Sequence, residues 1–248
     1  MLFKLEDRPS DSPFVDRIWR AQSEHIGDLL SIAMSHWEMV VSRYQDKMYM
    51  TIRGPETKAT SLPVTVVGTE FFGIRFKVGT VLPYLPASTL IDEDINLPDA
   101  SSKSFWLNGS AWQFPNYENA EAFVDRLVRQ DLLARDPVVE GALQGQPVNL
   151  SVRTTRRHFL RMTGLTQKTI RQIERARNAT VLLQEGMSIL DVVHAANYFD
   201  QPHLTRSLKH FIGKTPTQIV QKNESEQLSL LYKTEPPSLS YTVPITDS

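Results

Sequence analysis

The sequence predicts an α+β fold in which a strand-rich N-terminal domain precedes an all-helical one. Up to about residue 115, apolar residues alternate with small or charged ones, most regularly over 70–79, as half-buried strands require. From Glu118 onward the apolar spacing becomes helical, and Pro137 interrupts the pattern. The predicted domains are therefore a mixed α/β domain over 1–135, a helical domain over 136–223 and a flexible tail over 224–248.

Composition limits the class of protein. The 248 residues are 41% hydrophobic and 22% charged, which is ordinary for a globular protein. The absence of cysteine excludes disulfides, thiolate metal sites and a cysteine nucleophile. Because the chain has neither a long apolar run nor a signal-peptide stretch, we expect a cytoplasmic protein without a membrane partner.

Charge is distributed unevenly along the chain. Residues 145–223 carry 12 Lys and Arg against 4 Asp and Glu, a net +8, whereas the remainder carries 15 against 24, a net −9. This asymmetry is typical of a protein whose basic segment binds a polyanion. A solvated basic surface without such a partner is the alternative interpretation.

In the N-terminal domain, strands are expected over 37–41, 48–53, 64–67 and 70–79. Its aromatic residues are interpreted mainly as core, with some available to line a small-ligand pocket: Trp37, Tyr49, Phe72, Phe76, Trp106 and Trp112. The region also contains His25, His36, Glu38 and Glu70, and the first three of these could be assembled into a metal site. Isolated His and Glu are more often surface or pocket residues, so we predict no metal and no cofactor.

A helix is expected from about 118 to 133. Its apolar stripe consists of Phe123, Val124, Leu127 and Val128, and Asn116 or Asn119 could cap it. Two roles for this stripe remain open: packing against the sheet of the same chain, or forming a homodimer, for which a neighbouring strand edge is the other candidate.

The helical domain contains an internal repeat at an offset of 49 residues. Residues 157–166 match 206–215, so that Arg157 pairs with Arg206 and Gly164 with Gly213. Six residues before each Arg stands a good helix N-cap, Ser151 or Asp200. Each unit is therefore predicted to contain a capped helix of about three turns that ends at a glycine.

The second unit is predicted to be a helix-turn-helix. Ser188 opens a short helix, Asn197 tolerates a left-handed turn and Asp200 caps the next helix. That helix has an apolar stripe of Leu204, Leu208 and Phe211 and a largely basic opposite face of His203, Arg206, Lys209 and His210. Such a helix suits a DNA major groove, although a solvated helix on an ordinary bundle has the same pattern.

Residues 197–216 resemble the signature of AraC-type transcription regulators, and the resemblance extends over about 137–220. It implies two helix-turn-helix units joined by a long helix, here 167–185, with Ile170, Ile173, Ala176 and Leu183 as core residues. At 1.5 Å per residue this helix spans roughly 28 Å, close to one turn of DNA. The N-terminal domain resembles, more faintly, the sensor regions that precede such domains.

Two features depart from the family pattern. Asn197 stands where the family usually has glycine, which the left-handed tolerance of asparagine permits. The first unit must use 138–144 as its first helix, and the stretch 145–147 then lengthens the turn. Thr155 also stands at the position equivalent to Leu204, so that helix packs with less apolar area. The first unit is therefore expected to contact DNA in an atypical way.

The resemblance implies roles for individual residues. Expected near base edges are Gln201, His203 and Arg206 in the second unit and Arg153, Thr154, Arg156 and Arg157 in the first. Expected at phosphates are Arg161, Lys168, Lys209, His210 and Lys214. Because Arg157 and Arg206 recur in the repeat, they could instead hold their helices to a neighbouring element or to phosphate.

We therefore expect a transcription regulator that binds double-stranded promoter DNA and is not an enzyme. RNA polymerase, a small-molecule effector and a second copy of the chain are its other candidate partners. The chain contains no nucleophile elbow, phosphate-binding glycine loop or paired catalytic carboxylates. The alternative from another class is a small-molecule-binding enzyme of barrel type with a helical appendage.

Overall fold

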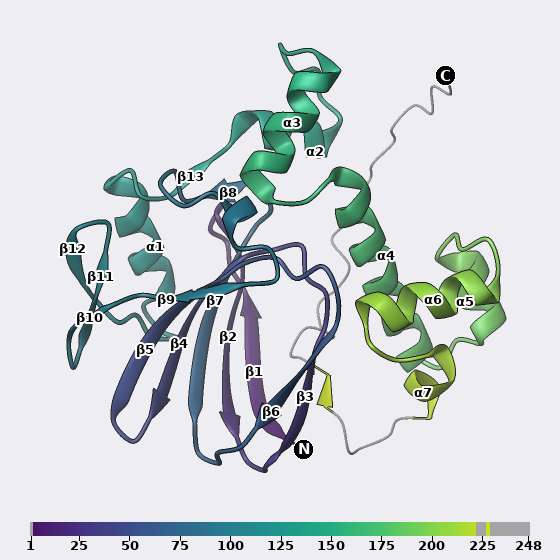
Figure 1. Cartoon of the computed structure of the whole chain (residues 1–248), viewed down its shortest axis with the longest axis horizontal. Coiled ribbons are helices and arrows are strands. Elements are labelled where there is room, and N and C mark those ends of the chain that lie inside the picture. The colour runs from purple at the N-terminus through teal and green to yellow at the C-terminus, as the bar shows by residue number, and fades with distance from the viewer. Residues whose placement is uncertain (1, 222–226, 229–248) are drawn as a thin grey trace.

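The computed structural model describes residues 2–221 and 227–228. Figure 1 shows strands filling the N-terminal region and helices the C-terminal one, which confirms the predicted fold class. Apart from the short strand β14 (Gln227–Leu228), the predicted flexible tail lies outside the described residues. Within the described part of the chain, no helix is long and apolar enough to cross a membrane.

A six-stranded antiparallel sheet forms the centre of the N-terminal region. Its strands, in spatial order, are β1 (Phe3–Pro9), β2 (Val15–Ser23), β7 (Glu70–Phe76), β4 (Glu38–Tyr44), β5 (Lys47–Arg53) and β9 (Asp94–Asn96). The central strands β4 and β7 carry buried side chains at successive positions. Because successive side chains point to opposite faces, the sheet is covered on both faces.

The first face packs against helix α1 (Ala120–Arg129) and a small sheet at the left of Figure 1. That small sheet contains β10 (Asp99–Ser101), β11 (Ser104–Leu107) and β12 (Ser110–Gln113). Phe123, Val124 and Leu127 are buried in this core. Val128 is partly buried against the same core, so the stripe on α1 packs largely within its own chain.

The second face lies beneath a lid made by β3 (Gly27–Ser31) and β6 (Thr60–Val64), with β14 pairing in parallel to β3. Two short elements lead toward the helical region. They are the pair β8 (Thr80–Val81) and β13 (Ala134–Arg135) and the 3₁₀ turn η1 (Ala87–Thr89).

The helical region follows the predicted order. Its helices are α2 (Pro137–Gln144), α3 (Val152–Thr163), α4 (Gln167–Gln184), α5 (Ile189–Ala195), α6 (Gln201–Phe211) and α7 (Pro216–Val220). The N-caps predicted in this region are confirmed, because the side chains of Ser151, Ser188 and Asp200 each accept a backbone N–H of the helix they precede. Asn119 precedes α1, but its side chain makes no capping hydrogen bond to that helix. Gly164 ends α3 in the left-handed conformation.

The core of the helical region includes residues from the N-terminal region. Ile32, Ala33 and Met34, which follow β3, are buried among side chains of α4, α5 and α6. The start of α2 at Pro137 coincides with the boundary drawn from the sequence, yet this hydrophobic cluster crosses it. The core of the helical region is therefore built from both regions, whereas the core beneath α1 belongs to the N-terminal region alone.

Shortening Leu127 tests the packing of α1. We expect Leu127→Ala to lower the free energy of unfolding by about 2–5 kcal/mol, because it leaves a cavity in a filled core. Leu160→Ala, at an exposed position on α3, should change it by less than about 0.5 kcal/mol. Denaturant unfolding measures both; unchanged stability together with an altered sedimentation coefficient for Leu127→Ala would instead identify an intermolecular contact.

Candidate nucleic-acid interface

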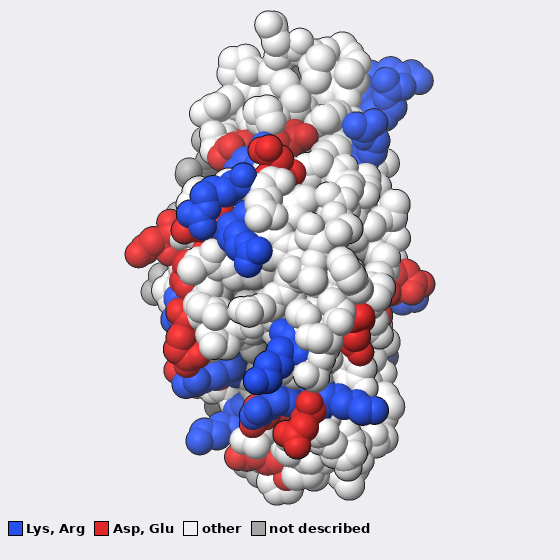
Figure 2. Space-filling model, turned by 90° about the vertical axis from the view of Figure 1, so that its left-hand side faces the viewer, with Lys and Arg blue, Asp and Glu red and all other residues white. Residues whose placement is uncertain are grey.

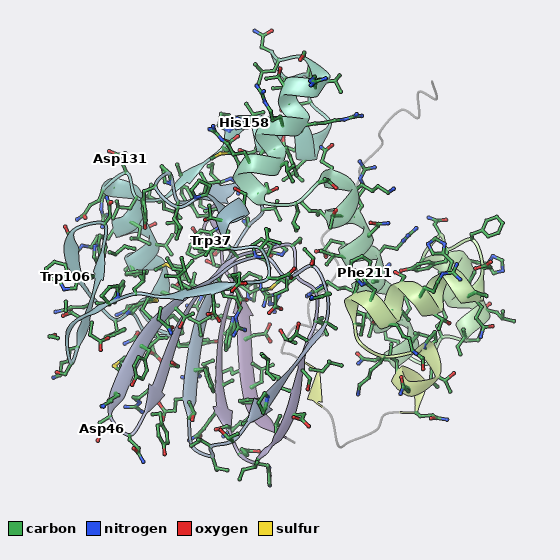
Figure 3. All side chains as sticks on the ribbon, viewed as in Figure 1. Trp37, Asp46, Trp106, Asp131, His158 and Phe211 are labelled. Carbon is green, nitrogen blue, oxygen red and sulfur yellow. The ribbon has the colours of Figure 1, made fainter. Side chains whose placement is uncertain are left out.

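Helix α6 presents a polar surface opposite its buried stripe. Leu204 and Leu208 are fully buried, and Phe211 lies at the end of α6 that faces the sheet (Figure 3). Exposed on the other side are Gln201, Arg206, Lys209 and His210. His203 is half-buried and meets the ring of Tyr198 edge-on, with the ring centroids 5.1 Å apart.

The turn before α6 is fixed by several contacts. Asn197 has φ of 53°, so it occupies the left-handed conformation expected from the sequence. The Tyr198 hydroxyl lies 2.9 Å from Ser207 Oγ on α6, and burial raises the pKa of Tyr198, which keeps the hydroxyl protonated. Arg175 of α4 stacks over the Tyr198 ring at 4.3 Å. The second unit is thus held firmly on α4.

The first unit is built from α2 and α3. Arg153, Arg156 and Arg157 are exposed on α3, and Thr154 is half-buried beside the capping Ser151. His158 Nε2 lies 2.7 Å from Asp136 Oδ2, and the other Asp136 oxygen accepts the first N–H groups of α2. The N-cap of α2 is therefore tied to the middle of α3.

A groove of about 540 Å³ lies along α4 and is lined by Lys168, Arg171, Gln172 and Arg175. These positions recur every three or four residues and so share one face of the helix. Sequence reasoning selected Lys168 alone from this set. The spacing of the basic residues over 168–175 was the signal that could have revealed Arg171 and Arg175.

The predicted phosphate contacts fall into two groups. Arg161, Lys168, Lys209 and His210 are exposed, as such a role requires. Lys214 is instead 94% buried, with a relative exposure of 6%, so its ammonium is not presented to a polyanion in this arrangement. The glycine turn at 213 places residue 214 toward the protein interior, which its position in the repeat did not reveal.

Charge is arranged differently on the N-terminal region. Figure 2 shows that the face with α1 and β10–β12 carries Lys and Arg interspersed with Asp and Glu around uncharged areas. In the groove along α4, by contrast, three of the four lining residues are cationic. A polyanion is therefore attracted to the helical region more than to that face.

The aromatic residues considered for a ligand pocket are not brought together. Trp37 and Phe76 stack with their ring centroids 4.0 Å apart in the core, whereas Tyr49 and Trp106 are exposed. Figure 3 shows Trp37 above the sheet and Trp106 on the distant hairpin. The strand alternation explains this result, because Phe72 and Phe76 point to the α1 side of the sheet.

A cavity of about 400 Å³ lies instead on the opposite face, beneath the β3–β6 lid. Its apolar wall includes Phe3, Trp19, Val40, Leu62 and Phe71. Its polar wall includes Ser31, Glu38, Arg53, Glu56 and Arg75. This size and mixed lining suit a small organic ligand.

Two carboxylates in this cavity have distinct surroundings. Glu38 Oε1 accepts hydrogen bonds from Arg75 Nε at 2.7 Å and Trp19 Nε1 at 3.3 Å, in a pair that is almost completely buried. Burial raises the pKa of Glu56, and the hydrogen bond donated by Ser31 Oγ at 2.7 Å opposes that effect. Glu56 therefore holds its proton to a higher pH than an ordinary glutamate.

The residues weighed for a metal site lie in separate environments. Glu38 pairs with Arg75, His36 is half-buried beside Ser35, and His25 is exposed. Glu70 accepts a hydrogen bond from Arg43 Nε at 2.9 Å. Among the described residues, no three potential ligands gather closely enough to hold a metal ion.

Glu56→Gln tests the buried carboxyl. The folded state raises the pKa of Glu56 above its unfolded value, so wild-type stability falls as the pH rises through the raised pKa. Glutamine cannot ionise, so the variant should match wild type near about pH 4 and melt at a higher temperature near about pH 7. Thermal unfolding followed by circular dichroism across this range measures the difference.

Ser31→Ala provides the companion variant. It removes the hydrogen bond that favours the ionised carboxylate, so its melting temperature should fall more steeply with pH than that of wild type. A Glu56→Gln curve parallel to wild type at every pH would show that residue 56 is solvated.

Comparison with known proteins agrees with the geometry. Residues 146–222 match a family model described as a helix-turn-helix domain, which spans α3 to α7. Searches of curated proteins and of solved structures found no match to the chain. The matched residues contain α3, the long helix α4 and the capped pair α5–α6, whereas α2 precedes the match. The C-terminal region of this chain is a DNA-binding helix-turn-helix domain of the AraC type, as found in transcription regulators.

Proposed function

We propose that the chain is a sequence-specific regulator that reads two successive major grooves of promoter DNA with α3 and α6. The observation that carries this proposal is the cationic groove along α4, which lies between two capped helices with exposed basic side chains. Phosphates between the two major grooves would contact this groove, because α4 links the two units along the chain.

The roles proposed for individual residues follow from their exposure. Gln201, His203 and Arg206 on α6 lie in its first two turns and can reach base edges; Arg153, Thr154, Arg156 and Arg157 have the same position on α3. Lys209, His210 and Arg161 lie nearer the helix ends and, with Lys168, Arg171 and Arg175, would neutralise phosphates.

Substitutions on α4 and α6 separate these roles. Arg171→Ala should weaken binding to all duplexes alike and reduce the slope of log affinity against log salt by about 1. Arg206→Ala should cost about 1–3 kcal/mol on the preferred duplex and relax its sequence preference. Fluorescence anisotropy of the full chain, on random duplex and on a duplex selected by the protein, measures both effects.

Lys47→Ala is the matched control, because it removes an exposed cation from the β4–β5 turn. Its neighbour Asp46 lies at the end of the sheet far from the helical units (Figure 3). The proposal fails if the full chain shows no salt-sensitive binding, or if Lys47→Ala lowers the slope as much as Arg171→Ala.

The cavity under the β3–β6 lid is the proposed effector site. Ser31, Met34 and Glu56 line it, and the backbones of Met34 and Glu56 exchange two hydrogen bonds of 2.8 and 2.9 Å. The neighbouring Ala33 and Ala59 donate N–H groups to the carbonyls of Phe211 and His210 at the end of α6. A ligand in the cavity would thus press on the segments that hold a reading helix.

An apolar fluorescent anion, 8-anilinonaphthalene-1-sulfonate, is a suitable probe of this cavity. We expect saturable fluorescence enhancement by the full chain and its loss in Val40→Phe, which fills the cavity. Circular dichroism confirms that the variant is folded. Equal enhancement by both proteins would place the dye elsewhere and remove the support for an effector site here.

A further inference from the structure

The two glycines that occupy equivalent positions in the internal repeat both press against the N-terminal region. Gly164 ends α3 and Gly213 follows α6, and both adopt the left-handed conformation, with φ of 75° and 81°. Other left-handed glycines of the helical region, Gly145 and Gly186, have nothing within 4 Å of the position that a Cβ would occupy. The close approach at Gly164 and Gly213 is therefore a property of the docking and not of helix termination.

The first contact joins α3 to η1 and the turn that follows it. A Cβ on Gly164 would lie 2.2 Å from Ile91 Cδ1 and 3.1 Å from the carbonyl oxygen of Ala87. The α2 side of the same unit is held as well, because Asp136 N donates to Gly79 O at 2.8 Å. The first reading unit is thus seated on the N-terminal region at two places.

The second contact joins the end of α6 to the lid of the cavity. A Cβ on Gly213 would lie 2.9 Å from Leu30 Cδ2 and 3.1 Å from Ala59 Cβ. The carbonyls of His210 and Phe211, which α6 cannot satisfy itself, accept N–H groups from Ala59 and Ala33 at 2.9 and 2.8 Å. The C-terminal end of the reading helix is therefore capped by another part of the chain.

Packing on α4 alone does not fix the positions of both reading helices, α3 and α6. It packs extensively on α5, α6 and α7, whereas α3 packs mainly on α2 and η1. Between α3 and α4 the backbone passes through the left-handed Gly164, a natural pivot. In both readers the anchored end is the C-terminal one, and the exposed side chains of Arg153 and Gln201 lie at the opposite ends.

We infer that the N-terminal region is a rigid frame that sets the spacing and orientation of α3 and α6 through the contacts at Gly164 and Gly213. This inference rests on the proposed function and adds a role for the N-terminal region beyond holding an effector. A frame of this kind favours DNA whose two half-sites match its spacing, because the second reader then engages without a further loss of freedom. Gly164, Gly213, Ile91 and Leu30 are its positioning residues.

The test uses the full chain and duplexes in which 1–5 base pairs are inserted between the two half-sites. These half-sites are located first, by selection from a random pool and footprinting. The affinity of the wild type should fall about tenfold or more once two or more base pairs are inserted. Each inserted base pair rotates the second major groove away from the helix that reads it. Gly164→Ala and Gly213→Ala should bind the original duplex more weakly and lose most of this dependence on spacing.

Gly145→Ala and Gly186→Ala are the matched controls, because they add the same left-handed strain where a Cβ meets nothing. They should keep the wild-type spacing profile. Ile91→Ala and Leu30→Ala shorten the side chains that face the two glycines without altering the helical region, so they test the frame if a glycine variant does not fold. Ile91→Ala and Leu30→Ala should likewise reduce the dependence of affinity on the number of inserted base pairs.

Two results would overturn the inference. In one, the anchor variants keep the wild-type spacing profile, which would show that α4 alone sets the spacing. In the other, they bind more tightly at every spacing, which would show that docking obstructs the readers. Failure of wild type to select any duplex is a different result and counts against the proposed function itself.

Discussion

The insertion of Ile32, Ala33 and Met34 into the helical core is the contact on which the relation between the two regions depends. Ile32 and Ala33 are fully buried, and the Ala33 N–H donates to Phe211 O at the end of α6. On the polar side, Ser35 Oγ donates to Glu174 Oε1 of α4 at 2.7 Å. Because apolar burial and satisfied backbone groups coincide here, separating the regions would expose both kinds of surface at once. The reading domain is thus stabilised by residues that precede it by more than a hundred positions.

That junction also relates the cavity to the reading helix. Residues 29–34 and 56–59 line or border the cavity on one side and hold α6 on the other. Because the backbones of Met34 and Glu56 are hydrogen-bonded directly to each other, we expect a displacement of the cavity wall to be transmitted to the segments that contact α6. On the sheet side of the cavity, Glu38 and Arg75 form an ion pair that is almost completely buried.

The proposed DNA-reading surface is assembled from three helices. Residues on α3 and α6 present polar side chains at their N-terminal ends, and α4 supplies a cationic floor between them. Arg175 illustrates how the parts are joined, since it faces this groove and also stacks on Tyr198 in the turn of the second unit. The same side chain therefore contributes positive charge to the groove and a packing contact to the turn before α6.

Local sequence determined the elements of this protein, because helix caps, left-handed positions and apolar periodicity are properties of a few neighbouring residues. Ser151, Ser188, Asp200 and Asn197 marked the helical units without any knowledge of tertiary contacts. The burial of Lys214, the site of the cavity and the partner of the α1 stripe were decided only by the tertiary structure. Each depends on which surface meets which across long sequence separations, as at Gly213 beside Leu30, and such a meeting leaves no periodic signal in the chain.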